Sequence, residues 1–276
     1  MDSLELLKAT EDLDATPLLP AQRRQRIVEF LHRHGAVTLQ QLEQALHVSM
    51  STLRRDLDAL AADGEVDRTH GGALLRHQEY STFEPDHAAA AELSPLEKRA
   101  IGKAAAEGLR PRQSVIFDSG STVLEAARAA AQMNIPLTAV TNNLAIAQVL
   151  GTSPLIQVHV FGGLLRHGSN TLTGDALIEG VRAIGVDVLL MGIHAVTEGE
   201  LTETAPEVAA VKRALLKAAA SKRLLVDSSK FRPRTFMRVA SVTELDEVIT
   251  DEGVPREEIE RMRALGVKLT LVGVPQ

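Results

Sequence analysis

The sequence of 276 residues contains no cysteine and no tryptophan, and it has one tyrosine and six phenylalanines. The lack of cysteine excludes disulfide frameworks, cysteine-ligated metal sites and thiol catalysis. The scarcity of aromatic side chains disfavours binding by stacking, which many proteins that bind single-stranded nucleic acid use. The chain is longer than one compact domain usually needs, so we expect two domains, or one large and one small.

Long apolar runs are missing as well. No stretch approaches the roughly 18 apolar residues that a membrane-spanning helix requires. Residues 1–20 are acidic and lack the basic and apolar regions of a secretory signal peptide, and we expect them to form a mobile tail. We therefore expect a cytoplasmic protein that has no membrane partner.

The formal net charge is −6, from 30 Lys and Arg against 36 Asp and Glu, which disfavours a surface that is basic overall. The charge is unevenly distributed, because residues 20–76 carry eight arginines and no lysine against seven acidic residues, a net of +1. Both flanking segments are negative. A small nucleic-acid-binding module in an acidic chain fits this distribution, and its binding would depend on a few well-placed arginines.

Residues 21–76 have the pattern of three short helices followed by a hairpin. Apolar residues spaced three and four apart predict a first helix that ends at Gly35. Thr38 and Ser49 are suitable N-caps for a second and a third helix, and Gly71-Gly72 can turn a two-stranded wing. This is the outline of a winged helix-turn-helix.

The third helix has an inward face made of leucines, namely Leu53, Leu57 and Leu60. At about 100° per residue, Ser51 and Arg55 point away from that face, with Thr52 and Arg54 on the flanks. Hydroxyls and arginines are side chains that read base edges and phosphates in a major groove. Asp58 also lies outward, so we expect that end of the helix to leave the groove, or Asp58 to pair with Arg54. An ordinary three-helix domain with a solvated charged face is the alternative that periodicity leaves open.

This module resembles the winged helix-turn-helix of the DeoR family of bacterial transcription regulators. Residues 48–75 contain the S-x-x-T-[IL]-R-R-D-L pattern of the recognition helix and the R-x-H-G-G pattern of the wing. A departure lies at Glu65–Asp67, where family members are often apolar or basic, and it would weaken phosphate contacts. The candidate DNA-binding residues are Thr38, Ser49, Ser51, Thr52, Arg54, Arg55, Arg68, His70 and Gly71.

After residue 93, apolar runs alternate with amphipathic helical stretches. We expect strands at 114–117, 137–140, 156–161, 186–191 and 224–226, and helices near 122–132, 143–150, 175–184, 206–220 and 255–264. Ser94 and Glu97 predict a capping box that opens a further helix. The alternation indicates an α/β domain with a mostly parallel sheet. We expect domains at 21–76 and 94–276, joined by a linker at 77–93.

Five of the expected strands end in polar or glycine-rich segments, namely Asp118–Thr122, Thr141–Asn143, Gly162-Gly163, Gly192–His194 and Asp227–Lys230. Ligands of open parallel sheets bind beyond the carboxyl ends of the strands. Gly120, its neighbouring hydroxyls and the start of the next helix suit a phosphate, for which Lys230 supplies a cation. Asp118, Asn142 and His194 suit sugar hydroxyls or a ring oxygen. Each ending alone could be a turn, a helix cap or, for His194, a core histidine.

Residues 94–272 resemble the effector domain of the same family, which is related in fold to ribose-5-phosphate isomerase and glucosamine-6-phosphate deaminase and binds phosphorylated sugars. The resemblance lies in the strand ends above and in the E-x-x-x-x-K-R segment Glu207–Arg213. Many members have a G-x-D-G pattern where this chain has His194-Ala195, which leaves its ligand preference open. The candidate effector-binding residues are Asp118, Ser119, Gly120, Ser121, Thr122, Thr141, Asn142, Gly163, His194, Lys212 and Lys230.

The resemblance implies a repressor of carbohydrate-metabolism genes that binds double-stranded operator DNA as a dimer or tetramer and responds to a phosphorylated sugar. The alternative is a sugar-phosphate isomerase or deaminase with an appended DNA-binding domain. The sequence spacing of the candidate acids and bases identifies no acid–base pair for such an enzyme; the candidates are Asp118, Glu203, Glu207 and His194. A DNA-binding structural protein would leave the polar strand ends unexplained. We expect no cofactor or metal, since nucleotide-binding motifs are missing.

Overall fold

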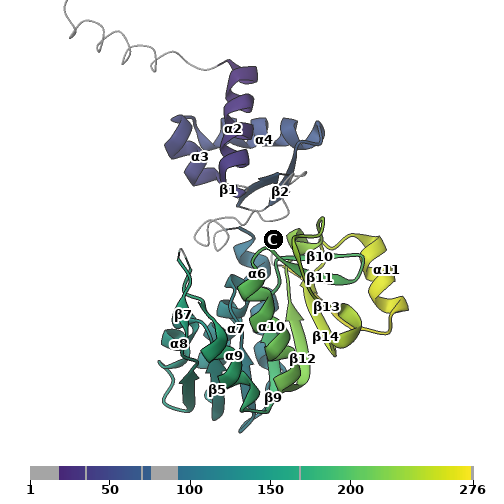
Figure 1. Cartoon of the computed structure of the whole chain (residues 1–276). Coiled ribbons are helices and arrows are strands. Elements are labelled where there is room, and N and C mark those ends of the chain that lie inside the picture. Colours follow the sequence, from purple (N-terminus) through teal and green to yellow (C-terminus); the bar gives the residue numbers. More distant parts are fainter. Residues whose placement is uncertain (1–18, 35, 70, 76–92, 168, 275–276) are drawn as a thin grey trace, which may run out of the picture. The chain divides into compact units, whose positions relative to one another are not determined.

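The computed structural model describes residues 19–34, 36–69, 71–75, 93–167 and 169–274 (Figure 1). The chain divides into two compact units that meet in the sequence near residue 76. Each unit is described by itself below. Within the described ranges, no helix is both long enough and apolar enough to cross a membrane.

The smaller unit contains three helices and a three-stranded sheet. Its elements are α2 (Pro20–His34), β1 (Ala36–Thr38), α3 (Leu39–Leu46), α4 (Met50–Ala62), β2 (Val66–Thr69) and β3 (Gly72–Leu75). The predicted helices and hairpin are confirmed. Strand β1 was not predicted, and it pairs antiparallel with β3, so that the order of the strands is β1-β3-β2. The inward leucines of α4 are buried, together with Ile27, Leu31, Val37 and Leu42.

The predicted helix caps differ in outcome. Thr38 forms a complete capping box, because its Oγ1 accepts a hydrogen bond from the amide of Gln41 (3.1 Å) and its own amide donates to Gln41 Oε1 (2.9 Å). Ser49 occupies the N-cap position of α4 without a side-chain capping bond. The capping box predicted at Ser94 is wrong: its φ of 50° is left-handed, whereas a capping serine has an extended backbone.

The larger unit is built on a seven-stranded sheet whose order is β15-β14-β12-β9-β4-β5-β6, and its strand pairs are parallel. The strands are β4 (Ser114–Phe117), β5 (Leu137–Thr141), β6 (Ile156–Val160), β9 (Val186–Met191), β12 (Ala219–Leu225), β14 (Glu247–Asp251) and β15 (Lys268–Val272). The helices are α6 (Pro95–Glu107), α7 (Ser121–Gln132), α8 (Leu144–Leu150), α9 (Asp175–Arg182), α10 (Pro206–Ala218) and α11 (Arg256–Ala264). The predicted α/β class with a mostly parallel sheet is confirmed.

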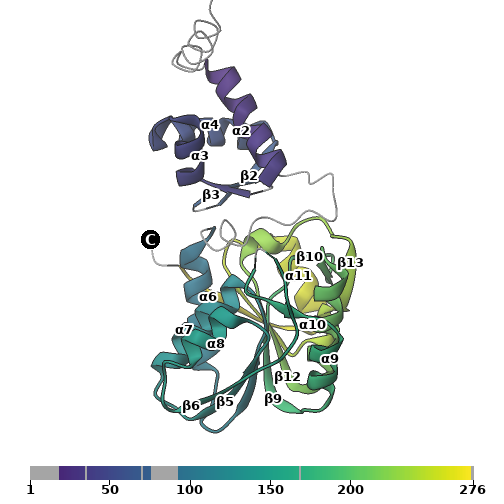
Figure 2. The same ribbon diagram turned by 60° about the vertical axis from the view of Figure 1, so that its left-hand side comes forward.

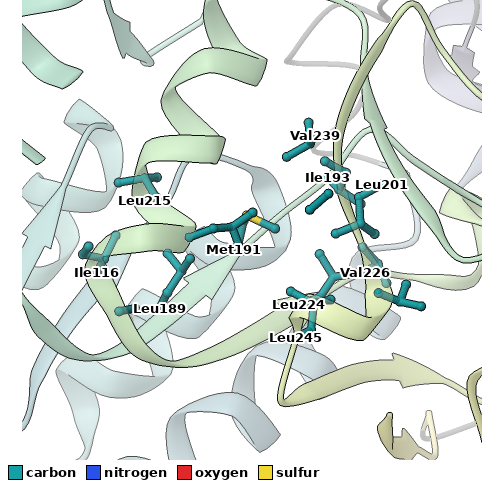
Figure 3. Close-up of a cluster of buried hydrophobic side chains, with 14 of the residues drawn as sticks. Ile116, Leu189, Met191, Ile193, Leu201, Leu215, Leu224, Val226, Val239 and Leu245 are labelled. Atoms are coloured by element: carbon teal, nitrogen blue, oxygen red, sulfur yellow. The ribbon is translucent and has the colours of Figure 1, made fainter. Parts of the chain in front are cut away.

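Helices cover both faces of this sheet, as the two views in Figures 1 and 2 show. Val115 and Phe117 of β4 join the core under α6, α7 and α8, whereas Ile116 joins the core under α9 and α10. The period of two follows from the alternation of side chains along a strand. Figure 3 shows Leu215 of α10 near Leu189 and Met191 of β9, in the core under α9 and α10. Because both faces are buried, these strands read as nearly continuous apolar runs.

Short antiparallel pieces were not predicted. These are the pair β7 (Leu164–Leu165) and β8 (Leu172–Thr173), and the sheet of β10 (Ala195–Thr197), β11 (Glu200–Glu203) and β13 (Met237–Ser241). These strands are too short for an alternation of apolar and polar residues to stand out in the sequence. The expected helix near 206–220 was also too long, since β12 already begins at Ala219, where it pairs with Val186 of β9. Alanines favour a helix there, but the pairing overrides that preference.

The order of the strands creates a switch point in the sheet. After β4, the chain adds β5 and β6 on one side, and it then returns to add β9 on the other side of β4. In open α/β sheets, ligands bind outside the carboxyl ends of the strands at such a reversal. The topology therefore places the expected crevice where β4 and β9 end.

Candidate functional site

A cavity of about 110 Å³ lies at the carboxyl ends of β4 and β9. Seven of the predicted effector residues line it, namely Ser119, Gly120, Ser121, Thr122, His194, Lys212 and Lys230. They come from the loop after β4, the end of β9, helix α10 and the short 3-10 helix η2 (Ser228–Lys230) after β12. The cavity is thus where the switch point requires it.

The floor of the cavity is an ion cluster around Lys212. Its ammonium donates to the carboxylate of Asp118 and to the carbonyl of Gly192 (2.8 Å), and it lies 3.6 Å from Glu203 Oε1. Asp118, Lys212 and Glu203 are buried, with relative exposures of 0%, 3% and 6%. Burial alone lowers the pKa of Lys212, but the two carboxylates outweigh it and raise the pKa above its ordinary value. Lys212 is therefore charged at neutral pH.

One wall of the cavity is the start of α7. Gly120 is the N-cap residue, and its φ of 133° is a conformation that side chains rarely adopt. The first amides of a helix have no acceptor inside the helix and point at whatever lies before it. Because the twelve-residue α7 opens beside the hydroxyls of Ser119, Ser121 and Thr122, this wall presents several donors to one place. Such a group of donors suits an anion.

Lys230 supplies a cation to the same cavity. It is the last residue of η2, which Asp227 caps by accepting a hydrogen bond from the amide of Ser229 (3.1 Å). Burial, followed by the charge of Arg232, lowers the pKa of Lys230 to about 8. Lys230 is therefore mainly protonated at pH 7, and a bound anion would stabilise its charged form.

His194 is held by an arginine that the sequence analysis did not single out. Arg232 Nη2 lies 2.6 Å from His194 Nε2, and Nε and Nη2 of the same guanidinium donate to the His194 carbonyl at 3.2 and 3.0 Å. A guanidinium can only donate, so Nε2 accepts and the imidazole is neutral. Burial, and then the charge of Arg232, hold the pKa of His194 well below its usual value.

Four predicted effector residues do not line the cavity: Asp118, which is buried beneath it against Lys212, and Thr141, Asn142 and Gly163. Thr141 is fully buried, and its Oγ1 accepts from the amide of Asn143 (3.1 Å). Asn142 Nδ2 donates to the carbonyl of Leu172 (3.4 Å). A Cβ on Gly163 would lie 2.5 Å from the carbonyl oxygen of Thr173, so this glycine permits a close approach of two backbones. In this structure Thr141, Asn142 and Gly163 connect β5 and β7 to β8.

Four further polar side chains line the cavity that were not among the candidate effector-binding residues, namely Arg166, Ser169, Thr171 and Glu203. The first three lie on or beside the β7–β8 pair, and Glu203 ends β11. Each residue is brought to the cavity by an antiparallel pairing of short strands, which local sequence patterns do not predict. The sequence named Glu203 only as a candidate acid or base of the alternative enzyme.

The smaller unit presents the predicted face of α4 to solvent. Ser51, Arg54 and Arg55 are exposed, and Ser49 is exposed with its Oγ 3.0 Å from Thr52 Oγ1. Thr38, by contrast, is buried, with 3% exposure, inside its capping box.

Two acidic residues hold α4 in place. The buried carboxylate of Asp56 forms a bidentate pair with Arg23 of α2, with Arg23 Nη2 3.0 Å from Oδ1. Asp58 pairs with the wing residue Arg68 at 3.1 Å and not with Arg54, which corrects that expectation and leaves Arg54 outward. Arg68 Nη1 also donates to the carbonyl of Gly72 (3.3 Å). Gly71 lies half-buried at the turn of the wing, and His70 lies outside the described residues.

Comparison with known families agrees with this architecture. A model of the DeoR-like helix-turn-helix domain matches residues 23–79, and a model of the DeoR C terminal sensor domain matches residues 94–252. The chain belongs to the DeoR family. This DeoR-family protein is 31% identical over 235 residues to the glycerol-3-phosphate regulon repressor of Escherichia coli K12, covering 85% of this chain and 92% of the relative.

A second relative is the HTH-type transcriptional repressor GlcR of Bacillus subtilis 168, which is 32% identical over 233 residues, or 83% of this chain and 88% of GlcR. Among solved structures, ribose 5 phosphate isomerase A of Neisseria gonorrhoeae aligns at 16% identity with a TM-score of 0.38. That alignment covers 52% of this chain and 55% of the isomerase chain.

The Arg232 contact predicts that His194 does not become protonated in the range where a free histidine does, between about pH 7.5 and 5.5. Ring nitrogen NMR shifts of the full chain should show a neutral imidazole with its proton on Nδ1. In the variant Arg232→Gln, the pKa of His194 should rise, because the neighbouring positive charge is lost. A wild-type titration midpoint near ~6.5 would contradict the assignment.

Proposed function

We propose that this DeoR-family protein is a transcription repressor whose binding to operator DNA is controlled by a phosphorylated sugar in the cavity at the β4–β9 switch point. The observation that carries the proposal is the convergence of the α7 N-terminus and Lys230 on one cavity. The names of the two relatives support the class, since one is the repressor of a glycerol-3-phosphate regulon and both are transcriptional repressors.

Helix α4 is the proposed DNA-reading element. Its exposed face offers Ser51, Arg54 and Arg55, which suit base edges and phosphates in a major groove. The Arg23–Asp56 pair fixes the helix against α2, so that these side chains project from a rigid element. The net charge of +1 over residues 20–76 is small, so we propose that two or four copies bind repeated half-sites together.

The phosphate of the sugar is proposed to lie against the start of α7, where amides and hydroxyls donate to it and Lys230 balances its charge. Hydroxyls of the sugar would then face His194, Arg166 and Glu203, which line the remaining cavity. Binding would connect the β4 and β9 ends with the β7–β8 pair, which carries Arg166. We propose that this changes how copies of the larger unit associate, and thereby the spacing of the α4 helices.

A sensor is favoured over an enzyme because the candidate acids and bases are already engaged. Asp118 and Glu203 share the ammonium of Lys212, and Glu207 lies 3.6 Å from Arg166. The Nε2 lone pair of His194 accepts from Arg232. General acid–base catalysis of an isomerase or deaminase needs a base whose lone pair faces the substrate. Turnover of ribose 5-phosphate or glucosamine 6-phosphate by the purified chain would overturn this choice.

The proposal includes the organisation of the chain. We propose residues 21–76 as the DNA-binding domain, whose first helix begins one residue earlier at Pro20, and residues 94–276 as the effector-binding domain. The proposed acidic tail at 1–20 and linker at 77–93 lie almost entirely outside the described residues. We propose a cytoplasmic location, where operator DNA and phosphorylated sugars are both present.

Arg55→Ala should weaken binding to an operator fragment by roughly 5- to 150-fold, which corresponds to the loss of one bidentate base contact of about 1–3 kcal/mol. The fragment can be selected from a random-sequence DNA pool with the wild-type protein. Affinity is measured by fluorescence anisotropy at fixed salt. Arg256→Ala on α11 is the matched control, since it removes the same charge from an exposed side chain outside the DNA-binding unit. Equal effects of the two substitutions would refute the assigned face of α4.

The low pKa of Lys230 predicts that affinity for a phosphorylated sugar falls as the pH rises from 7 to 9. The phosphate is already a dianion over this range, since its second pKa is about 6. The free protein loses the Lys230 proton with a pKa of about 8, and the bound phosphate raises that pKa, so binding takes up a proton above pH 8. Calorimetry should show a loss of up to about tenfold per pH unit there.

Two variants control this pH experiment. Lys230→Arg should keep the affinity and remove its dependence on pH, because arginine does not lose its proton in this range. Lys230→Met should abolish the effector response while DNA binding persists. A Lys230→Met protein that responds normally would count against the phosphate site.

A further inference from the structure

The charges around the cavity are unequal once their pairings are counted. The cations near it are Arg166, Lys212, Lys230 and Arg232, all of which lie close enough to lower the pKa of His194. The carboxylates are Asp118 and Glu203 at the cavity, and Glu207, whose Oε1 lies 3.6 Å from Arg166 Nε. The next acid, Asp227, faces Lys98 as well as Lys230. The cavity region described here therefore has an excess of positive charge.

The two carboxylates at the cavity are engaged by one ammonium. Asp118 accepts a hydrogen bond from Lys212 and is fully buried, so it does not face a ligand. Glu203 lines the cavity, but its Oε1 lies 3.6 Å from the same Lys212 nitrogen. A ligand ammonium placed at Glu203 would compete with Lys212 for this carboxylate and would lie beside a buried like charge.

His194 adds a hydrogen-bond donor to the wall. Its Nε2 accepts from Arg232 Nη2, so the single proton of the neutral ring is on Nδ1. The ring lines the cavity, and no described residue accepts a hydrogen bond from Nδ1. The Nδ1–H group is thus available for an acceptor on the ligand, such as a hydroxyl, a carbonyl or a ring oxygen.

We infer that the cavity selects phosphorylated sugars whose remaining polar groups are oxygens, and that it rejects those carrying a free amine. This inference rests on the proposed function and names the ligand class for the same site. The amine of an amino sugar is protonated at neutral pH, and it would meet a donor at His194 and the guanidinium of Arg232 that holds this imidazole. Fixed like charges and mismatched donors discriminate against a ligand more strongly than missing contacts do.

The test compares ligands that differ at one carbon. The full chain is titrated by calorimetry at about pH 6.5 with glucose 6-phosphate, its 2-deoxy analogue and glucosamine 6-phosphate, beside a thermal-shift panel of triose, pentose and hexose phosphates. We expect the amine to bind at least about tenfold more weakly than the hydroxyl compound. The deoxy analogue should lose less affinity than the amine, because it lacks the hydroxyl but carries no charge.

Two substitutions at His194 test the physical cause. His194→Asp replaces the donor with a carboxylate, and it should raise the affinity for glucosamine 6-phosphate relative to glucose 6-phosphate. His194→Asn is the matched control of similar size and no charge, and it should keep the preference of the wild type. If the aspartate variant does not fold, the wild-type comparison of amine and deoxy ligands still decides the question.

The possible failures are distinguishable. If no phosphorylated sugar in the panel binds, the proposed function fails and the inference fails with it. If sugar phosphates bind but the amine binds as tightly as the hydroxyl compound, or the deoxy analogue is as weak as the amine, the effector proposal stands and the charge-based selection is wrong.

Discussion

The larger unit depends on one buried ammonium. Lys212 of α10 contacts Asp118 at the end of β4, the Gly192 carbonyl at the end of β9 and Glu203 at the end of β11. Removing either partner from a buried ion pair leaves an uncompensated charge, which costs about 3–5 kcal/mol. The ammonium therefore holds the two sides of the switch point, the covering helix and the small antiparallel sheet in one arrangement. The cavity is the space that this arrangement leaves.

The same ion cluster engages the groups at the cavity that could move a proton. Lys212 occupies the carboxylates that could have served as bases, and Arg232 occupies the lone pair of His194. What remains are donors and cations at fixed positions, namely the α7 amides, the hydroxyls after β4 and Lys230. Preformed donors of this kind hold an anion without moving a proton. In the smaller unit, the Arg23–Asp56 pair has a similar part, because it fixes α4 and leaves its arginines outward.

The sequence was sufficient to predict the strands that are buried on both faces and the edge of the sheet at which the cavity lies. Strands β4 and β9 begin and end where they were predicted, because a strand that is buried on both sides is an unbroken apolar run. The polar strand ends predicted the cavity, since parallel strands end at one edge. The sequence could not show that Thr141 accepts a hydrogen bond from Asn143 or that Asn142 donates one to Leu172, 30 positions away.

Residues that reach the site from distant segments were beyond local patterns. Arg166 directly follows the two-residue strand β7, and Arg232 contacts His194 although the two residues are 38 positions apart in the sequence. Asp58 is another example, since its partner Arg68 lies on the wing and not one helical turn away. In each case several charged residues have similar local sequence patterns, and tertiary packing determines which of them forms the contact.

The central claim is that the cavity of the larger unit is energetically coupled to DNA binding by the smaller one. The most direct measurement is the dissociation constant of a phosphorylated sugar for the full chain, determined by calorimetry with and without saturating operator DNA. Linkage requires DNA to change the affinity for the sugar by the same factor by which the sugar changes the affinity for DNA. Coupling between the two sites predicts two equal factors that both differ from one. A sugar affinity that operator DNA leaves unchanged would contradict it.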